Sequence, residues 1–289
     1  MLKKVLNMEL KLKVYNRIQH LYKVISRDSL FIPAVETHCR LMIEEFKKDR
    51  LYYKYIFSNN RFVISTVTAS VFFNKDEAFL SDVVSECLTT GLVSHNTITS
   101  LLLLFNVSGR ISLRESDNDK RKKSFKITRK GRLDIIKLLN TMVPALSLMF
   151  EGPYNPKIIS DDQISVFFKS YAKIHRSSLF IINFVNDLDV FISKDSGHMI
   201  LVYLYMLAIE DNKPKAILSL VSKECGVSRT HLRNILIAAE EINMLSFNKK
   251  TGEITIYESF VKMFTSYMAY YFSFVQFGLE GGHLSDNAD

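Results

Sequence analysis

A dense run of cations is the part of this sequence most capable of chemistry. Residues 120–132 read KRKKSFKITRKGR, and eight of them are Lys or Arg while none is acidic. Positive charges this close repel one another unless a polyanion screens them. The run therefore predicts phosphate contact, and the alternative is a solvated, flexible basic loop. The formal net charge of +8 also favours a polyanionic partner, either nucleic acid or an anionic membrane surface.

The residues around this run alternate as they do in two β-strands. Ile111 and Leu113 come before the run, and Phe125 and Ile127 lie inside it. Between them, residues 116–119 read SDND, which are turn-forming residues. Alternating apolar residues on both sides of a turn predict a hairpin at about 110–128. The cations would then lie on a shaped element with a charged tip.

Residues 216–244 show a helix-turn-helix pattern, which is followed by a second, shorter ribbon. Gly226 can supply the turn, and Ser228 is a good N-cap for the next helix. Helical periodicity turns Leu232, Ile235, Leu236 and Ala239 inward. The outer side then holds Arg229, His231, Arg233 and Asn234, which we expect to reach base edges in a major groove. An ordinary pair of packed helices is the alternative.

The corresponding helix before the basic hairpin is less polar. It reads SHNTITSLLLLF over residues 94–105 and contains no Lys or Arg. We expect residues 101–105 to be mainly buried. The side chains left for a groove are His95, Asn96, Thr99 and Ser100.

These two regions repeat one another at a nearly constant offset. The matching segments are 81–87 with 219–225, 93–98 with 227–232, and 110–113 with 244–247. The offset changes once, by four residues, in the turn at 88–92. This pattern favours a duplicated unit, and chance similarity between amphipathic helix pairs is the alternative.

The basic hairpin resembles the wing of MarR-family transcription regulators. The resemblance rests on a tip motif, Asp119-Lys-Arg121, and a closing motif, Ile127-Thr-Arg-Lys-Gly131, and it covers roughly residues 60–140. It implies that Arg121 enters the minor groove and that Asp119 holds the tip in place. Lys120, Lys122 and Lys123 would then contact phosphates without specifying sequence. The chain departs from the family in having two units and in lacking Asp-x-Arg in its short second ribbon, residues 248–253.

This resemblance implies a sequence-specific transcriptional regulator that binds double-stranded DNA. Taken with the internal repeat, the fold would be mainly α with small β-ribbons, as tandem winged helix-turn-helix domains in a pseudo-dimer, so that each copy meets one half-site. The chain would act as a monomeric pseudo-dimer or as a homodimer, with a small aromatic compound as a possible effector. Two alternatives stay open: a plasmid-type replication initiator with tandem winged helices, and a winged-helix protein-interaction scaffold.

The periodicity predicts helices near 1–25, 29–57, 60–73, 79–88, 94–106, 160–192, 197–211, 214–224, 228–242 and 258–277, and one starting near residue 128. Ribbons are expected at about 110–128 and 244–257. Residues 151–157, EGPYNPK, are the best linker candidate. We therefore divide the chain into domains at 1–150 and 158–278, with a flexible tail at 279–289.

Other chemistry finds little support in the sequence. Cys39, Cys87 and Cys225 are scattered and predict small buried hydrophobes, not a disulfide framework or a metal site. No phosphate-binding glycine loop or nucleophile elbow occurs, so we expect no enzyme and no cofactor. No apolar run reaches the roughly 20 residues of a spanning helix. We expect a cytoplasmic protein with no membrane partner.

Overall fold

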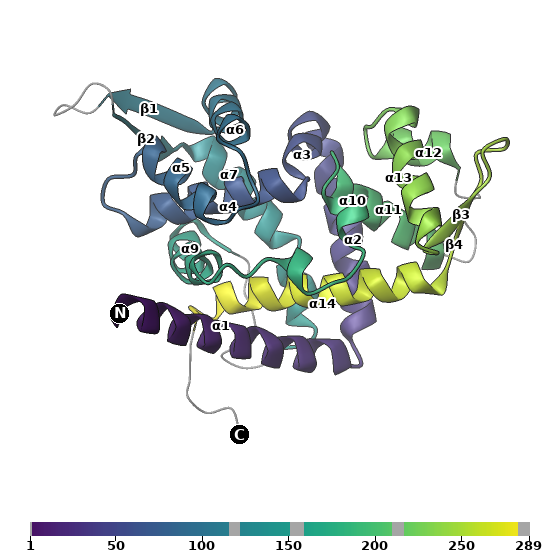
Figure 1. The fold of residues 1–289 in the computed structure, drawn as a ribbon, viewed down its shortest axis with the longest axis horizontal. Helices are drawn as coiled ribbons and strands as arrows, with labels where there is room; N and C mark the ends of the chain where they lie inside the picture. The colour runs from purple at the N-terminus through teal and green to yellow at the C-terminus, as the bar shows by residue number, and fades with distance from the viewer. Residues whose placement is uncertain (1, 116–121, 151–158, 210–216, 283–289) are drawn as a thin grey trace. The chain divides into compact units, whose positions relative to one another are not determined.

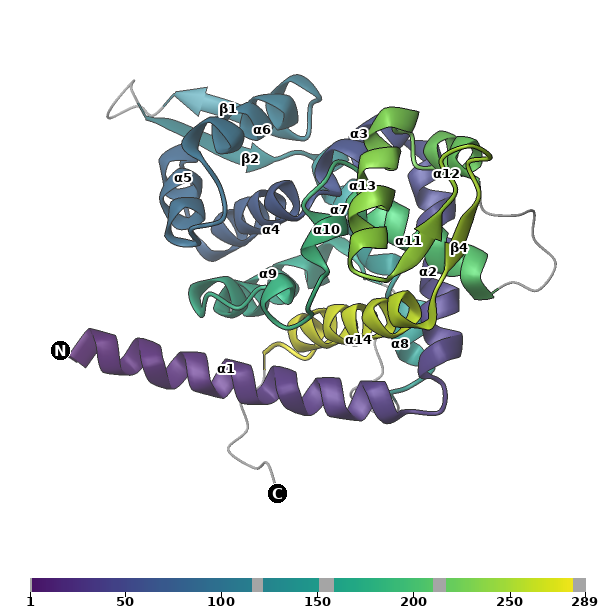
Figure 2. The same cartoon turned by 45° about the vertical axis from the view of Figure 1, so that its right-hand side comes forward.

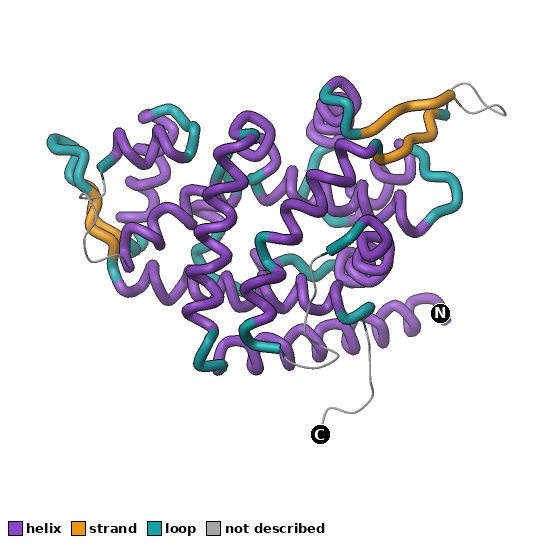
Figure 3. Tube along the Cα trace, turned by 180° about the vertical axis from the view of Figure 1, so that it is seen from behind, coloured by secondary structure: helices purple, strands orange, loops and turns teal. Residues whose placement is uncertain are grey.

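The computed structural model describes residues 2–115, 122–150, 159–209 and 217–282. Within these ranges the chain is mainly helical, and Figure 3 shows its strands gathered in two hairpins. Each hairpin is a two-stranded antiparallel sheet. The predicted class, mainly α with small β-ribbons, is confirmed at this level. Among the helices described, none is long and apolar enough to cross a membrane.

The chain forms two compact units that are interleaved along the sequence. Unit 1 comprises residues 1–31, 60–180 and 271–289, and unit 2 comprises 32–59 and 181–270. The division expected from sequence was linear and placed a linker at 151–157, which lies outside the described residues. Each unit thus draws on segments from distant parts of the chain.

Unit 1 contains the basic hairpin, and Figure 1 shows this hairpin beside α5 and α6. Its elements are α1 (Leu2–Arg27), α4 (Asn59–Asn74), α5 (Leu80–Thr89), α6 (His95–Val107), β1 (Ile111–Glu115), β2 (Lys123–Ile127), α7 (Arg129–Asn140), α8 (Val143–Ser147), α9 (Asp161–Arg176) and the end of α14 (Glu258–Leu279). The helix predicted over 60–73 is confirmed as α4. Aromatic packing helps to hold the unit together, since the rings of Phe73 and Phe168 stack with their centroids 5.7 Å apart.

The end of the described chain is packed into unit 1. The Glu280 carboxylate pairs with Arg17 at 2.6 Å, and only 2% of the Glu280 side chain is exposed. Lys173 Nζ donates to the carbonyl oxygen of Gly282 at 3.1 Å. The expectation of a flexible tail from residue 279 is therefore wrong for residues 279–282, because a buried ion pair and a backbone contact fix them. Residues 283–289 lie outside the described part of the chain.

Unit 2 contains the second helix pair and the shorter hairpin, visible as α12, α13 and β4 in Figure 2. Its elements are α2 (Phe31–Lys48), α3 (Arg50–Ile56), η2 (Ile181–Asn183), α10 (Asp189–Ile192), α11 (Gly197–Ile209), α12 (Leu218–Glu224), α13 (Arg229–Glu241), β3 (Leu245–Phe247), β4 (Ile254–Ile256) and most of α14. The continuous helical stretch expected over 160–192 is wrong. Helix α9 ends at Arg176, and the backbone then turns through Ser178, whose φ is +52°.

The aromatic C-terminal helix, α14, packs through buried side chains. In unit 2, Phe260, Phe264 and Met268 are fully buried on α14. The ring of Phe264 stacks on Tyr205 of α11 with centroids 4.4 Å apart. The three cysteines are buried too, which confirms their expected role as small core residues. Burial raises the pKa of the Cys87 thiol to about 12, so this thiol stays protonated at neutral pH.

Matched positions in the two units make matched backbone contacts. The Arg110 amide donates to the Phe105 carbonyl oxygen at 2.8 Å, and the Met244 amide donates to that of Ala239 at 3.0 Å. Gly109, just before Arg110, has φ +72°, and Asn243, just before Met244, has φ +57°. The helix thus ends in the same left-handed turn before each ribbon. This agreement supports the internal repeat seen in the sequence.

Candidate nucleic-acid interface

A helix pair presents the first set of predicted contact residues. Helices α5 and α6 are joined by a turn in which Gly91 has φ +70°. Ser94 caps α6, because its hydroxyl oxygen accepts from the Thr97 amide at 3.3 Å. The structure exposes all four predicted side chains of this helix, namely His95, Asn96, Thr99 and Ser100.

The apolar half of α6 is only partly buried. Leu101, Leu102 and Phe105 are at most 5% exposed and hold the helix against unit 1. Leu103 is 62% exposed and Val107 is 76% exposed. The expectation that residues 101–105 are mainly buried is therefore wrong at Leu103. One run of apolar residues wraps around a helix, so some of its members must face away from the core.

The register of the ribbon fixes which side chains face outward. Ile111 pairs with Ile127 and Leu113 pairs with Phe125, so these apolar residues share one face. Ile111, Ile127 and Phe125 are buried. The opposite face carries Ser112, Arg114, Ser124 and Lys126. The hairpin predicted from the alternating apolar residues is thus confirmed. Its two faces differ, since one is apolar and anchors the hairpin and the other is polar and charged.

The exposed cations of the ribbon extend beyond the predicted set. Lys122 and Lys123 are exposed, as predicted, while Asp119, Lys120 and Arg121 lie outside the described residues. Four further exposed cations share this region, Arg114, Lys126, Arg129 and Lys130; the last three belong to the basic run at 120–132, although no single contact was assigned to them, and Arg114 was not singled out. Strand parity was the available signal, since Arg114 and Lys126 alternate with the buried residues. We name these six described cations, Arg114, Lys122, Lys123, Lys126, Arg129 and Lys130, the basic ribbon.

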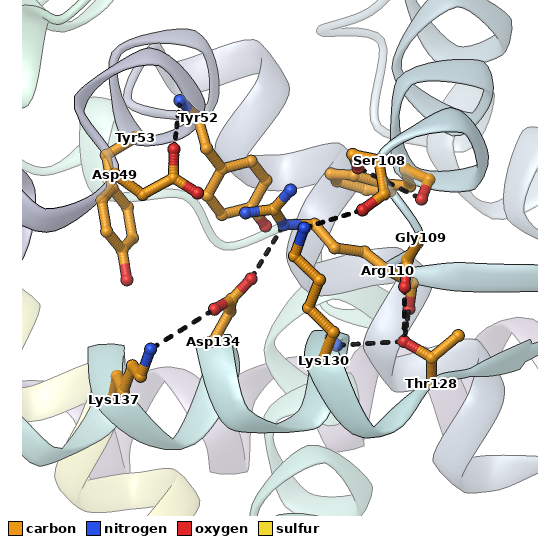
Figure 4. Close-up of polar contacts among 12 residues, drawn as sticks. Asp49, Tyr52, Tyr53, Ser108, Gly109, Arg110, Thr128, Lys130, Asp134 and Lys137 are labelled. Atoms are coloured by element: carbon orange, nitrogen blue, oxygen red, sulfur yellow. Dashed lines mark hydrogen bonds and ion pairs between the residues drawn. The ribbon is translucent and has the colours of Figure 1, made fainter.

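The closing motif fixes the ribbon to the end of α6 (Figure 4). Thr128 caps α7 by accepting from the Gly131 amide at 3.2 Å, and its hydroxyl donates to the Gly109 carbonyl oxygen at 2.7 Å. Lys130 Nζ donates to the Ser108 carbonyl oxygen at 3.0 Å. A Cβ at Gly131 would lie 2.4 Å from the backbone oxygen of Arg110. The Thr and Gly of the motif are therefore needed where α6, β1 and α7 meet.

A shielded ion pair reinforces the same junction. Arg110 Nε donates to Asp134 Oδ2 at 2.8 Å, with 6% and 15% of their side chains exposed (Figure 4). A charge-assisted hydrogen bond at so shielded a site contributes more to stability than one between exposed side chains. Arg110 is thus a structural cation, in contrast to the exposed basic ribbon beside it.

The second helix pair presents a more cationic surface. Ser228 caps α13 by accepting from the His231 amide at 3.1 Å. Of the predicted contact residues on α13, Arg229, Arg233 and Asn234 are exposed. His231 is half-buried, and its Nε2 lies 3.1 Å from the Asp195 carbonyl oxygen. This contact holds the His231 ring against the segment that precedes α11.

An arginine from a distant helix supports the turn between α12 and α13. Arg50 of α3 donates through Nη1 to the Lys223 carbonyl oxygen at 3.1 Å. Its aliphatic stem lies 3.3 Å from where a Cβ would stand at Gly226, whose φ is +65°. The Glu224 carboxylate accepts a hydrogen bond from the Tyr203 hydroxyl at 2.7 Å. These contacts fix the approach to α13, and nothing in the sequence around Arg50 signals that role.

The tip of the second ribbon is exposed, including Lys249 and Lys250. The Asn248 side chain accepts from the Lys250 and Thr251 amides at 2.9 and 3.1 Å, which forms a tight turn. The short turn explains why this ribbon projects fewer cations than the first. Across the described residues, no group of three His, Cys, Asp or Glu side chains is arranged to hold a metal ion.

The geometry therefore provides two exposed helix faces, one basic ribbon and one short ribbon, each anchored by caps and by apolar contacts. Comparison with protein-family models, with curated proteins and with solved structures finds no match to this chain.

Proposed function

We propose that this chain is a sequence-specific regulator of transcription that binds double-stranded DNA through two winged helix-turn-helix units. In this proposal α6 and α13 are the recognition helices and enter major grooves. The β1–β2 ribbon is a wing that contacts phosphates and, through Arg121 at its tip, the minor groove. The alternatives of a replication initiator and of a protein-interaction scaffold lead to different experimental outcomes, given below.

The observation that carries the proposal is the basic ribbon. Its six cations are exposed on or beside β1 and β2 and at the start of α7, and the Thr128 and Gly131 contacts fix this region to the end of α6. Fixed cations lose less conformational entropy on binding than cations on a loose loop. A phosphate backbone is a polyanion that such a cluster of exposed cations can contact, and each phosphate contact releases counterions.

The proposal is tested by fluorescence anisotropy with random-sequence duplex DNA at several salt concentrations. For the intact chain we expect affinity to fall steeply as salt rises, because several Lys and Arg contacts are lost. Replacing Arg121 by Ala should weaken binding most where the DNA flanks are A·T-rich. Lys262→Ala is the matched control, since Lys262 is an exposed cation that pairs with Glu258 on α14.

Absence of duplex binding at low salt would contradict the proposal and favour the scaffold. Normal binding by the Arg121 variant on A·T-rich flanks would refute its place in the minor groove. Sequencing genomic fragments that the chain retains then separates regulator from initiator. Sites scattered upstream of genes support the regulator, whereas one array of repeated sites supports the initiator.

A further inference from the structure

The exposed faces of α6 and α13 differ in chemistry although their positions match. Thr99 and Arg233 are 134 residues apart, as are the N-caps Ser94 and Ser228. The exposed stripe of α6 runs through Asn96, Thr99 and Leu103, with spacings of three and four that place them on one side of the helix. Helix α6 contains no Lys, Arg, Asp or Glu.

Thr99 presents its methyl group to solvent. Its hydroxyl donates within the helix, lying 3.1 Å from the His95 carbonyl oxygen and 3.2 Å from that of Asn96. The hydroxyl proton is thus used inside the helix, which leaves the γ-methyl as the apolar group for an outside contact, beside a hydroxyl oxygen that can still accept. Leu103, one turn further on and 62% exposed, adds an apolar branched end to the same stripe. A soluble helix gains nothing from exposing both groups to water.

The chemistry of this stripe matches one kind of base pair. In the major groove, thymine alone among the DNA bases presents a methyl group, and apolar side chains read it by contact. Adenine presents the donor and acceptor pair that an asparagine amide reads in a bidentate manner. From Asn96 to Leu103 the stripe is about 10 Å long, which spans about three base-pair steps.

The matching face of α13 has the opposite chemistry. Arg229 and Arg233 are four residues apart and exposed, so they project from one side of the helix. An arginine guanidinium reads guanine O6 and N7 with two parallel hydrogen bonds.

We infer that the two units read different bases: α6 reads A·T pairs through the Asn96 amide and the thymine methyl contacts of Thr99 and Leu103, and α13 reads guanine through Arg229 and Arg233. This inference rests on the proposed DNA binding. It makes the target an asymmetric site with one methyl-read segment and one guanine-read segment.

The test uses duplexes that the full chain selects from a random-sequence pool. In one series, each thymine of a selected duplex is replaced by uracil, which removes the methyl and keeps base pairing. In a second series, each guanine is replaced by 7-deazaguanine, which removes the N7 acceptor. We expect affinity losses of about fourfold per contacted methyl and about tenfold or more per contacted N7, because its partner is a charged guanidinium, in two separate segments of the site.

Protein variants assign each segment to its helix. Thr99→Ser keeps the hydroxyl and its bonds within the helix but removes the methyl, so it should abolish the response to uracil at one position. Arg233→Lys keeps the charge but not the paired donors, so it should abolish the response to 7-deazaguanine at one position. Each variant is the control for the other, because the segment read by the unchanged helix should respond as before.

The outcomes separate this inference from the proposed function. Failure to bind any duplex at low salt overturns both. Salt-dependent duplex binding that is indifferent to uracil and to 7-deazaguanine overturns the base assignment alone. If every position that responds to uracil with the unchanged protein still responds in both Thr99→Ser and Leu103→Ala, the base assignment is also overturned.

Discussion

Gly131 offers the sharpest test of how the ribbon is anchored. In the Gly131→Ala variant, the new Cβ would stand 2.4 Å from the Arg110 backbone oxygen and 2.9 Å from Ile127 Cγ2. Real Cβ atoms essentially never approach other atoms so closely, and the first obstacle is backbone, which cannot rotate aside. Either α7 or the start of β1 must shift.

The cost can be worked out from the contacts at this junction. Overpacking of this kind costs roughly 1–3 kcal/mol. A shift would also weaken the bond from the Thr128 amide to the Arg110 oxygen, at 3.0 Å, and that from the Thr128 hydroxyl to the Gly109 oxygen, at 2.7 Å. Each such bond contributes about 1 kcal/mol. Alanine regains about 1 kcal/mol of helix propensity, so we expect a net loss of about 2–4 kcal/mol.

Urea unfolding followed by circular dichroism measures this loss. The matched control is Arg129→Ala, which introduces the same residue two positions earlier, at an exposed site of the same helix. Hydrogen exchange should also show that the backbone amides of residues 128 and 131 exchange faster in Gly131→Ala than in the unchanged protein. If Gly131→Ala is as stable as Arg129→Ala, the close approach of α7 to β1 is not what the glycine serves.

Further predictions concern charge and pH. Replacing Lys122 and Lys126 together by Ala should make the slope of log affinity against log salt shallower by about 2, as two phosphate contacts are lost; an unchanged slope in anisotropy titrations would remove them from the interface. Asp134→Ala should cost about 2 kcal/mol in urea unfolding, because the largely buried Arg110 guanidinium loses this charge-assisted hydrogen bond, and stability equal to wild type would contradict that role. Burial, with a smaller contribution from nearby His38, lowers the pKa of His198 to about 3. Below about pH 6.5 this histidine is protonated in the unfolded chain but stays neutral in the folded chain. The free energy of unfolding should therefore fall by about 2 kcal/mol through this residue as pH drops from 7 to 5. A flat pH profile that His198→Gln leaves unchanged would contradict this prediction.

Features with a local cause were the most predictable from sequence. The caps at Ser94, Thr128 and Ser228 and the turn at Gly226 depend on residues within a few positions, and the structure shows each of them. The hairpin register also followed from the alternation of buried residues. Local geometry of this kind needs only backbone preferences and periodicity.

Features that depend on distant partners were not predictable. The support that Arg50 gives to the turn after α12 joins residues 173 positions apart. The end of the chain was expected to be flexible, because nothing near Glu280 announces its ion pair with Arg17. The exposure of Leu103 depends on which side of α6 meets the rest of unit 1, and the run of leucines hides that choice.

The interleaving of the two units sets an order for folding during synthesis. Unit 2 has all its segments once residue 270 is made, whereas unit 1, although begun first, still lacks residues 271–282. Those residues include Glu280, the partner of Arg17. The residues of the basic ribbon are thus made well before residues 271–282, which complete the unit that carries them. Separating the chain between α7 and α9 would give two fragments, neither with a whole unit.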